Sequence, residues 1–371
     1  RKCSYCDFLS APATEQTREA YMAALFAEIG GRAKDYSDRT VTSIFIGGGT
    51  PSLLSGEQIG QLMDCIREQF AMAQDAEITM EVNPGTASAE KLRNFYTAGI
   101  NRLSIGMQSA QAEELKNLGR IHDFEGFCQV YREAVEAGFT NINVDIMSGL
   151  PGQTLASYRD TLEKVLHLEP MPQHISAYSL IVEEGTPFAA MAERGELPLP
   201  EEETERAMYE ETIEVLAKYG FHRYEISNYA RDGYECRHNV GYWIRRDYLG
   251  FGIGAASLID NVRFQNEKSL GAYLAHPLES REEEQTLTVQ DRMEETMFLG
   301  LRLTRGVSCV DFAEQYGRTV EEVYGEVIAR NVADGLLTVT ERKENQKKDR
   351  FLALTKRGLD LSNYVMAQFL F

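Results

Sequence analysis

Between residues 41 and 181 the chain alternates short runs of β-branched or apolar residues with amphipathic stretches of helical length. Such alternation is typical of parallel βα units, in which the carboxyl ends of the strands face a common site. The predicted strands are 43–46, 77–82, 102–106, 141–146 and 174–178, and the predicted helices lie near 56–71, 88–98, 111–118, 124–138 and 154–168.

The pattern changes after residue 181. Residues 182–200 are rich in Glu, Gly and Pro and predict a connector, which a helix near 208–219 follows. From Asp291 onward, two helical faces precede Gly335 and two short strands around a charged loop, an order typical of a winged-helix domain. We therefore expect three regions, namely a βα core over 1–181, a connector and Tyr-, Asn- and Gly-rich segment over 182–290, and a winged-helix-like domain over 291–371.

Composition narrows the class of protein. The 371 residues include 38 basic and 57 acidic side chains, for a net charge of −19, and 43% are hydrophobic. No apolar run approaches the roughly 18 residues of a membrane span. The negative charge repels phosphate backbones, and acidic residues also outnumber basic ones over 291–371, so we expect no nucleic-acid partner. The winged-helix-like domain is instead expected to contact a partner surface.

The six cysteines are too sparse and irregular for a secreted disulfide scaffold, and no signal-peptide pattern precedes them. We therefore expect a cytoplasmic protein. Arg1 is not a natural initiator, so we expect an incomplete N-terminus. The pair in Cys3-Ser4-Tyr5-Cys6 is compatible with a redox pair, half a zinc site, part of an iron–sulfur ligand set or two unrelated thiols.

Two further groups of residues are candidates for chemistry. Gly47-Gly48-Gly49-Thr50-Pro51 follows the first visible strand, where glycines let backbone amides approach a ligand or simply form a flexible loop. Glu81, Gln108, Arg120 and Asp145 are polar, and three of them end strands of apolar character. Active sites of parallel βα folds lie at this edge, although each residue alone could form a structural salt bridge.

Several motifs, in order over nearly the whole chain, resemble a known family. Cys3-x-x-Cys6-Asp7-Phe8 is similar to the end of the CxxxCxxC signature of radical S-adenosylmethionine (SAM) enzymes. The motifs that resemble the oxygen-independent coproporphyrinogen III oxidase family are Gly47-Gly48-Gly49-Thr50-Pro51-Ser52, Glu81-Val82-Asn83-Pro84, Asn101 to Ser109, Gly119-Arg120-x-His122, Asp145 to Thr154 and Tyr248 to Ala255.

The resemblance implies an α/β fold, a radical-SAM partial (β/α)6 barrel with its first strand missing from this chain and a C-terminal helical, winged-helix-like domain. It implies that Cys3 and Cys6, with a third cysteine expected just before Arg1, hold a [4Fe–4S] cluster whose fourth iron binds SAM. The implied SAM-binding residues are Tyr5, Gly48, Gly49 and Thr50 around the methionine end, Glu81 and Asp145 as acceptors, and Gln108 and Arg120 near the carboxylate.

Two branches of this family differ at defined positions. Decarboxylating oxidases resemble CxxxCxxCxC, whereas Phe8 stands at the place of the additional cysteine. Arg237-His238-Asn239-Val240-Gly241-Tyr242-Trp243 resembles the HNxxYW motif of the HemW branch, which consists of heme chaperones. This resemblance implies His238 as an axial heme ligand beside an aromatic platform, with Cys236 as the alternative ligand. The neighbouring Arg237, Arg245 and Arg246 could neutralise propionates or form surface salt bridges.

We therefore predict a heme chaperone with a radical SAM core that binds a [4Fe–4S] cluster, SAM and heme and delivers heme to acceptor proteins. Coproporphyrinogen oxidase activity is not expected. The alternatives are an oxygen-independent coproporphyrinogen III oxidase and a binding scaffold that has lost its cluster. Peripheral membrane association, the oligomeric state and the productive cleavage of SAM stay open.

Overall fold

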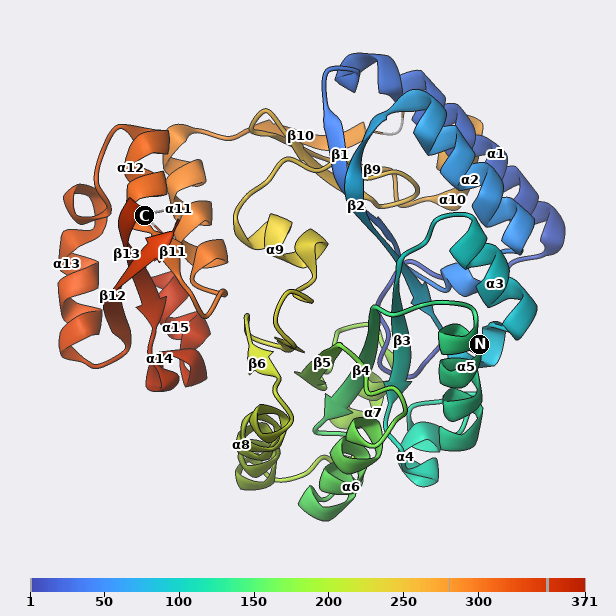
Figure 1. Cartoon of the computed structure of the whole chain (residues 1–371), viewed down its shortest axis with the longest axis horizontal. Helices are drawn as coiled ribbons and strands as arrows, with labels where there is room; N and C mark the ends of the chain where they lie inside the picture. The colour runs from blue at the N-terminus through green and yellow to red at the C-terminus, as the bar shows by residue number, and fades with distance from the viewer. Residues whose placement is uncertain (1, 280, 345–346, 371) are drawn as a thin grey trace.

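A computed structural model describes residues 2–279, 281–344 and 347–370 of the chain (Figure 1). Its centre is a curled sheet in which the first five strands are parallel. These strands confirm the five that the hydrophobic pattern predicts. In sheet order, the seven described strands are β1 (Thr40–Ile46), β2 (Ala71–Val82), β3 (Arg102–Gln108), β4 (Ile142–Ser148), β5 (His174–Ser179), β7 (Asn228–Ala230) and β6 (His222–Arg223).

The sheet extends beyond the region predicted for it. Strand β7 pairs antiparallel with β5, with Ala230 opposite His174, and β6 pairs with β7. Both short strands come from the region 182–290, which the sequence predicts only as connector and family-specific segment. Strands of two and three residues carry no readable alternation, and these form because buried Tyr229 and Ala230 cover the edge of β5.

Helices cover the outer face of the sheet and bury its apolar side chains. All five helices predicted before residue 170 are present. Phe95, Phe127 and Leu162 from three of these helices pack in one core with Ile105 and Val144 of the sheet. The outer helices are α2 (Gly56–Gln69), α3 (Ala89–Thr97), α4 (Ala112–Asn117), α5 (Phe124–Glu136), α6 (Leu155–Leu166) and α8 (Glu202–Lys218), with a short α7 (Pro187–Glu193) in the connector.

The sequence pattern did not predict helix α1 (Glu15–Arg32), which packs against α2 and α10 (Leu270–Ala275). Its Glu28 is fully buried and accepts hydrogen bonds from Asn266 Nδ2 at 2.7 Å and Tyr273 Oη at 2.7 Å. This carboxylate therefore ties α1 to a small antiparallel sheet, whose strands in order are β10 (Arg281–Thr286), β9 (Val262–Asn266) and β8 (Ala256–Ile259).

The C-terminal domain has the predicted winged-helix-like order. Its elements are α11 (Val289–Gly300), β11 (Val307–Ser308), α12 (Cys309–Tyr316), α13 (Val320–Ala333), β12 (Leu337–Glu344), β13 (Lys347–Leu354), α14 (Lys356–Asp360) and α15 (Ser362–Ala367). The sheet order is β11-β13-β12, and Met297, Phe312, Leu352 and Phe369 meet in its core. The short elements β11, α12, α14 and α15 were not predicted.

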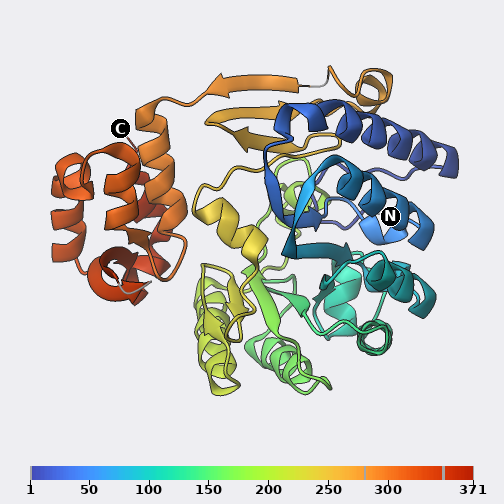
Figure 2. The same ribbon diagram turned by 45° about the horizontal axis from the view of Figure 1, so that its top comes forward.

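Helix α9 (Arg237–Trp243) lies between the half-barrel and the C-terminal domain, as Figures 1 and 2 both show. It contacts β1 on one side and α11 on the other. Helix α9 therefore connects β1 of the curled sheet with the C-terminal domain. In the described parts of the chain, no helix combines the length and apolar character that a membrane span requires.

Candidate functional site

The cysteine loop is fixed against the segment after α4. The Ser4 N–H donates to Leu118 O at 3.0 Å, and the Cys6 N–H donates to Cys3 O at 3.3 Å, which closes a turn. Gly119 has a φ of +76°, and a Cβ there would come within 3.4 Å of Ser4 Oγ. Both cysteines are partly exposed free thiols. The loop therefore presents two partly exposed thiols, and Cys3 lies near Arg120.

Tyr5 and Arg120 form the contact that joins this loop to the sheet. Arg120 Nη2 donates to Tyr5 Oη at 2.8 Å, and burial raises the pKa of Tyr5 to about 12 although Arg120 opposes this shift. Arg120 Nε is buried and has no hydrogen-bond partner among the described residues. Arg120 also borders a cavity of about 500 Å³, together with Gly85, Gly119 and His122. A carboxylate ligand would supply the missing acceptor.

The glycine-rich loop after β1 meets Glu81 at the end of β2. The Gly48 N–H donates to Glu81 Oε2 at 3.1 Å, and Gly48 and Gly49 have φ of +78° and +63°. A Cβ at Gly48 would meet no heavy atom within 4 Å, so this backbone borders open space. Thr50 follows at the start of a short 3-10 turn. Burial raises the pKa of Glu81 to about 7, and neighbouring Asp145 adds to this shift.

Gln108 ends β3, whereas Asp145 lies in the middle of β4, opposite Gly106. Gln108 is buried with a φ of +69°, and its Oε1 accepts from Tyr178 Oη at 2.9 Å. Gly106 permits this packing, because a Cβ there would lie 2.9 Å from Gln108 Nε2 and 3.5 Å from Arg120 Nη2. Burial raises the pKa of Asp145, whereas hydrogen bonds from its neighbours oppose the shift. Tyr178 is a site residue that the sequence did not indicate.

These residues fit the groups that the motifs imply. Two thiols on one turn suit part of an iron–sulfur ligand set, and an unpartnered guanidinium nitrogen suits a carboxylate. No ion pair of Glu81 or Asp145 is seen among the residues that the structure describes, and these carboxyls suit the hydroxyl or ammonium groups of a ligand. The described residues contain no ready group of three or more His, Cys, Asp or Glu for a metal ion.

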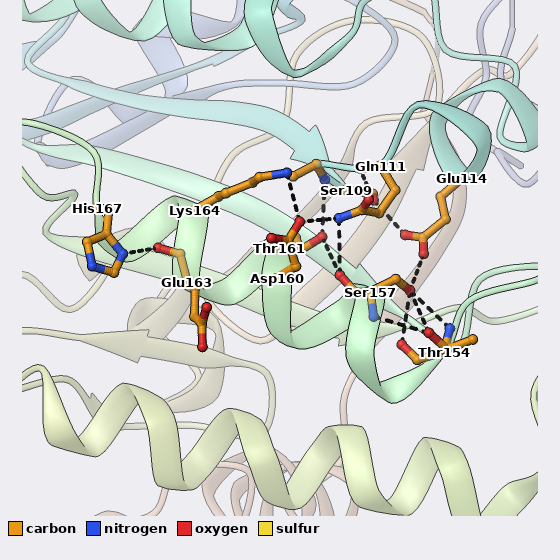
Figure 3. Close-up of polar contacts among 11 residues, drawn as sticks. Ser109, Gln111, Glu114, Thr154, Ser157, Asp160, Thr161, Glu163, Lys164 and His167 are labelled. Atoms are coloured by element: carbon orange, nitrogen blue, oxygen red, sulfur yellow. Dashed lines mark hydrogen bonds and ion pairs between the residues drawn. The ribbon is translucent and has the colours of Figure 1, made fainter.

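Part of the Asp145-to-Thr154 motif is structural. Thr154 caps α6 by accepting from the Ser157 N–H at 3.1 Å, and Ser157 Oγ donates to Glu114 Oε1 of α4 at 2.6 Å (Figure 3). Glu114 is buried and also accepts from Gln153 Nε2 at 3.0 Å and Ser109 Oγ at 2.5 Å. The end of this motif therefore joins α4 to α6 on the outer face of the sheet.

Helix α9 is anchored by a carboxylate from inside the sheet. Glu77 of β2 is 5% exposed, and its two carboxylate oxygens accept from the backbone N–H groups of Arg237 and His238, each at 3.0 Å. These N–H groups belong to the first turn of α9 and have no partner within the helix. Glu77 thus fixes the beginning of the HNxxYW helix.

Both ring nitrogens of His238 have hydrogen-bond partners. Nδ1 lies 3.1 Å from Ser43 Oγ, and Nε2 lies 3.1 Å from Tyr242 Oη. The imidazole stacks on Phe45, with ring centroids 5.1 Å apart. Burial lowers the pKa of His238 to about 4, so the ring is neutral at pH 7, as a metal ligand must be.

The aromatic residues that contact His238 are not all from the HNxxYW motif. Its aromatic neighbours are Phe45 and Tyr242, whereas Trp243 packs under the Arg302 guanidinium, whose carbon lies 4.4 Å from a ring centroid. Trp243 also borders a cavity of about 730 Å³ beside α12. Of the two aromatic residues of the HNxxYW motif, Tyr242 therefore contacts His238 and Trp243 does not, because residues five apart on a helix face different directions.

The three arginines near this motif have different environments. Arg245 is buried in an ion pair with Glu295 at 2.7 Å, and Arg237 pairs with Asp75 at 2.9 Å. These two arginines therefore form salt bridges, the alternative to neutralising heme propionates. Arg246 is exposed, and no side-chain contact of Arg246 is seen within the described residues.

Cys236 does not have the environment of a thiolate ligand. It is fully buried, and its Sγ lies 3.5 Å from Glu77 Oε1, to which the thiol donates. Burial raises the pKa of Cys236 to about 11, so the thiol is protonated at pH 7. The geometry therefore favours His238 over Cys236.

Several buried polar residues of the inner face were missed. Those that are buried are Glu77, Arg102, Asn143 and His174, and the partly exposed Ser176 lies two residues after His174 on β5. The signal was present, since polar residues at every second position of a strand share one face. It was overlooked because the strands were predicted from their apolar positions alone.

Comparisons with known proteins agree with this geometry. The Radical SAM superfamily model matches residues 1–165, and the HemN C-terminal domain model matches residues 287–361. The chain is 38% identical to the heme chaperone HemW of Bacillus subtilis, over 99% of this chain and 96% of that protein. It is 36% identical to HemW of Escherichia coli, over 91% and 89% of the two chains.

The coproporphyrinogen III oxidase HemN of Escherichia coli, described as a radical SAM enzyme, has a similar solved structure. Its TM-score is 0.84 at 26% identity, covering 100% of this chain and 87% of that chain. The fold and the residues at the strand ends define a radical SAM protein. The chain belongs to the HemW family of heme chaperones.

Proposed function

We propose that this protein is a cytoplasmic heme chaperone that binds a [4Fe–4S] cluster and SAM at the carboxyl ends of the strands, binds heme at α9 and passes it to acceptor proteins. The observation that carries the proposal is His238 of α9, whose backbone N–H is anchored by Glu77 and whose buried ring is neutral at pH 7. The similarity to heme chaperones over nearly the full chain supports it.

The residues at the strand ends suit two cofactors. Cys3 and Cys6 would ligate cluster iron, and Arg120 and Gln108 would bind the SAM carboxylate. The Gly48–Thr50 backbone and Tyr5 would border the methionine portion, while Glu81 and Asp145 would accept from its polar hydrogens. A bound cluster would supply the electron for a one-electron reduction of SAM.

Heme ligation by His238 requires a local change at α9. One ring nitrogen must exchange its hydrogen bond with Tyr242 or Ser43 for iron. The proton then stays on the other nitrogen, whose hydroxyl partner keeps the ring oriented. Arg246, exposed at the end of α9, is the arginine of this segment best placed to meet a propionate.

The second candidate is coproporphyrinogen III oxidase activity, which the structural similarity to HemN favours. Against it, Phe8 is 59% exposed at the place where the oxidases carry another cysteine. Incubating the full-length, anaerobically reconstituted protein with SAM, a reductant and coproporphyrinogen III separates the two. A heme chaperone leaves the porphyrinogen unchanged and binds heme stoichiometrically. Formation of protoporphyrinogen with turnover, in the absence of heme binding, would replace the chaperone proposal with the oxidase.

A further inference from the structure

A line of buried hydrogen bonds connects the carboxyl end of the sheet with α9. Asp145 Oδ1 lies 2.7 Å from Asn143 Nδ2, and Asn143 Oδ1 lies 2.6 Å from Nδ1 of His174. Nε2 of His174 lies 2.9 Å from Tyr224 Oη, which is 3.3 Å from the backbone nitrogen of Cys236, the residue before α9. The line therefore runs from a proposed SAM contact to the helix that carries His238.

Each link has a defined direction when Asp145 is ionised. A carboxylate only accepts, so Asn143 turns its NH2 group to Asp145 and its carbonyl to His174. His174 must then carry its proton on Nδ1, and its Nε2 accepts from the Tyr224 hydroxyl. The Cys236 N–H can only donate, and it donates to Tyr224. In each of the four hydrogen bonds, the donor therefore lies on the α9 side and the acceptor on the Asp145 side.

The line is sealed from solvent, which makes its links interdependent. Asn143 and His174 are each 1% exposed, and Cys236 is fully buried. Asn143 uses all its hydrogen-bonding capacity, because Nδ2 also donates to Ser104 Oγ at 2.7 Å and Oδ1 accepts from Ser176 Oγ at 3.1 Å. A reversal at one link would leave a buried polar group unsatisfied unless the next link changes with it.

Binding of the ligand proposed at Asp145 would select the direction of these hydrogen bonds. Burial raises the pKa of Asp145 and so increases its protonated fraction, in which the carboxyl can donate a hydrogen bond and permits the Asn143 amide to flip and His174 to change tautomer, whereas hydrogen bonds from its neighbours and the charge of Arg102 oppose this shift. A ligand hydroxyl or ammonium that donates to Asp145 favours the carboxylate and the direction described above. In the reversed direction Tyr224 Oη accepts from His174 Nε2 as well as from the Cys236 N–H, so its hydrogen bond to the start of α9 changes in strength.

We infer that Asn143, His174 and Tyr224 are positioning residues that couple occupancy of Asp145 to the position of α9 and thereby to heme affinity. The inference rests on the proposed function, in which SAM contacts Asp145 and α9 carries the heme ligand. By linkage, heme then strengthens SAM binding by the same factor as SAM strengthens heme binding.

The test uses Trp243, the only tryptophan of the chain, as a reporter on α9. In full-length reconstituted protein, SAM should shift Trp243 emission and lower the heme Kd at least about fivefold. His174→Phe should remove both effects, whereas His174→Gln should retain most of them, because an amide can donate at one end and accept at the other. His167→Phe, at an exposed position on the C-terminal end of α6 (Figure 3), is the matched control and should behave as wild type.

A second measurement does not depend on either ligand. Asp145→Asn removes the anion that directs the line, so it should shift Trp243 emission and the nitrogen-15 signals that report the His174 tautomer. In the His174→Phe background the same substitution should leave the emission unchanged. If wild type binds both ligands and SAM leaves the heme Kd unchanged, the coupling is refuted while the proposed function stands. If either ligand fails to bind, the proposed function fails, and unchanged emission and tautomer in Asp145→Asn would refute the coupling separately.

Discussion

Glu77 Oε1 accepts a hydrogen bond from the backbone N–H of His238 at 3.0 Å, so a carboxylate inside the half-barrel fixes the helix that carries the candidate heme ligand. The other oxygen holds the Arg237 N–H in the same way. The HNxxYW segment is thus part of the inner wall of the barrel, and its position depends on β2.

Removal of this anchor should destabilise the protein. Glu77→Ala leaves two helix N–H groups without a charged acceptor, for an expected loss of about 1.5–3 kcal/mol in the free energy of unfolding. Glu77→Gln keeps one acceptor oxygen and should lose less. Glu68→Ala, at an exposed position of α2, should change stability by no more than about 0.5 kcal/mol. Denaturant unfolding measures all three, and equal stability of Glu77→Ala and Glu68→Ala would contradict the anchoring role.

The hydrogen bond between His238 and Tyr242 should compete with heme. Tyr242→Phe keeps the aromatic ring but removes the hydroxyl that is hydrogen-bonded to His238 Nε2. Because this hydrogen bond no longer has to be broken, heme binding should tighten about 2- to 10-fold, the equivalent of one net hydrogen bond. Tyr248→Phe is the matched control, because its ring packs edge-on against Tyr242, and among the described residues Tyr248 forms no hydrogen bond or ring contact with His238. A Soret titration compares the two variants. Weaker heme binding in Tyr242→Phe would show that this hydroxyl supports the bound state instead.

The pH dependence of heme binding should reflect the burial of His238. A neutral imidazole is needed for ligation, and the lowered pKa of about 4 keeps the ring neutral well below the ordinary value near 6.5. Heme affinity through His238 should therefore persist as pH falls from 7 to 5 and decline only as it approaches about 4. NMR titration of the His238 ring in the heme-free protein checks the cause, and a midpoint near 6.5 would be inconsistent with the buried environment.

Arg120 should determine SAM affinity. Loss of a charge-assisted contact to a desolvated carboxylate in Arg120→Ala should weaken SAM binding by about 1.5–3 kcal/mol. Arg159→Ala is the control, because Arg159 forms an exposed ion pair with Glu211 on the outer helices. Calorimetry on full-length reconstituted protein measures both. Unchanged affinity in Arg120→Ala would limit this residue to holding Tyr5.

The sequence predicts the parallel strands and their helices well because the apolar periodicity of a buried sheet is long and regular. It also indicates the glycine loop directly after β1 and Glu81 at the end of β2, whereas Arg120 follows α4 and is indicated by its motif. It does not indicate that His238 meets Ser43 and Phe45, since contacts across nearly two hundred residues depend on how α9 enters the barrel. Tyr178 and His174 escape notice for a related reason, because a polar residue within a strand acquires its role only from the strand beside it.

Ferric heme titrated into wild type, His238→Ala and Cys236→Ala tests the heme-binding proposal most directly. Wild type should bind stoichiometrically, and Cys236→Ala should keep its Soret and electron paramagnetic signatures, because that thiol is buried and protonated. His238→Ala should shift both signatures and release heme faster. Signatures altered by Cys236→Ala but not by His238→Ala would transfer the ligand to Cys236, and heme binding indifferent to both would contradict the assignment of α9 as the heme site.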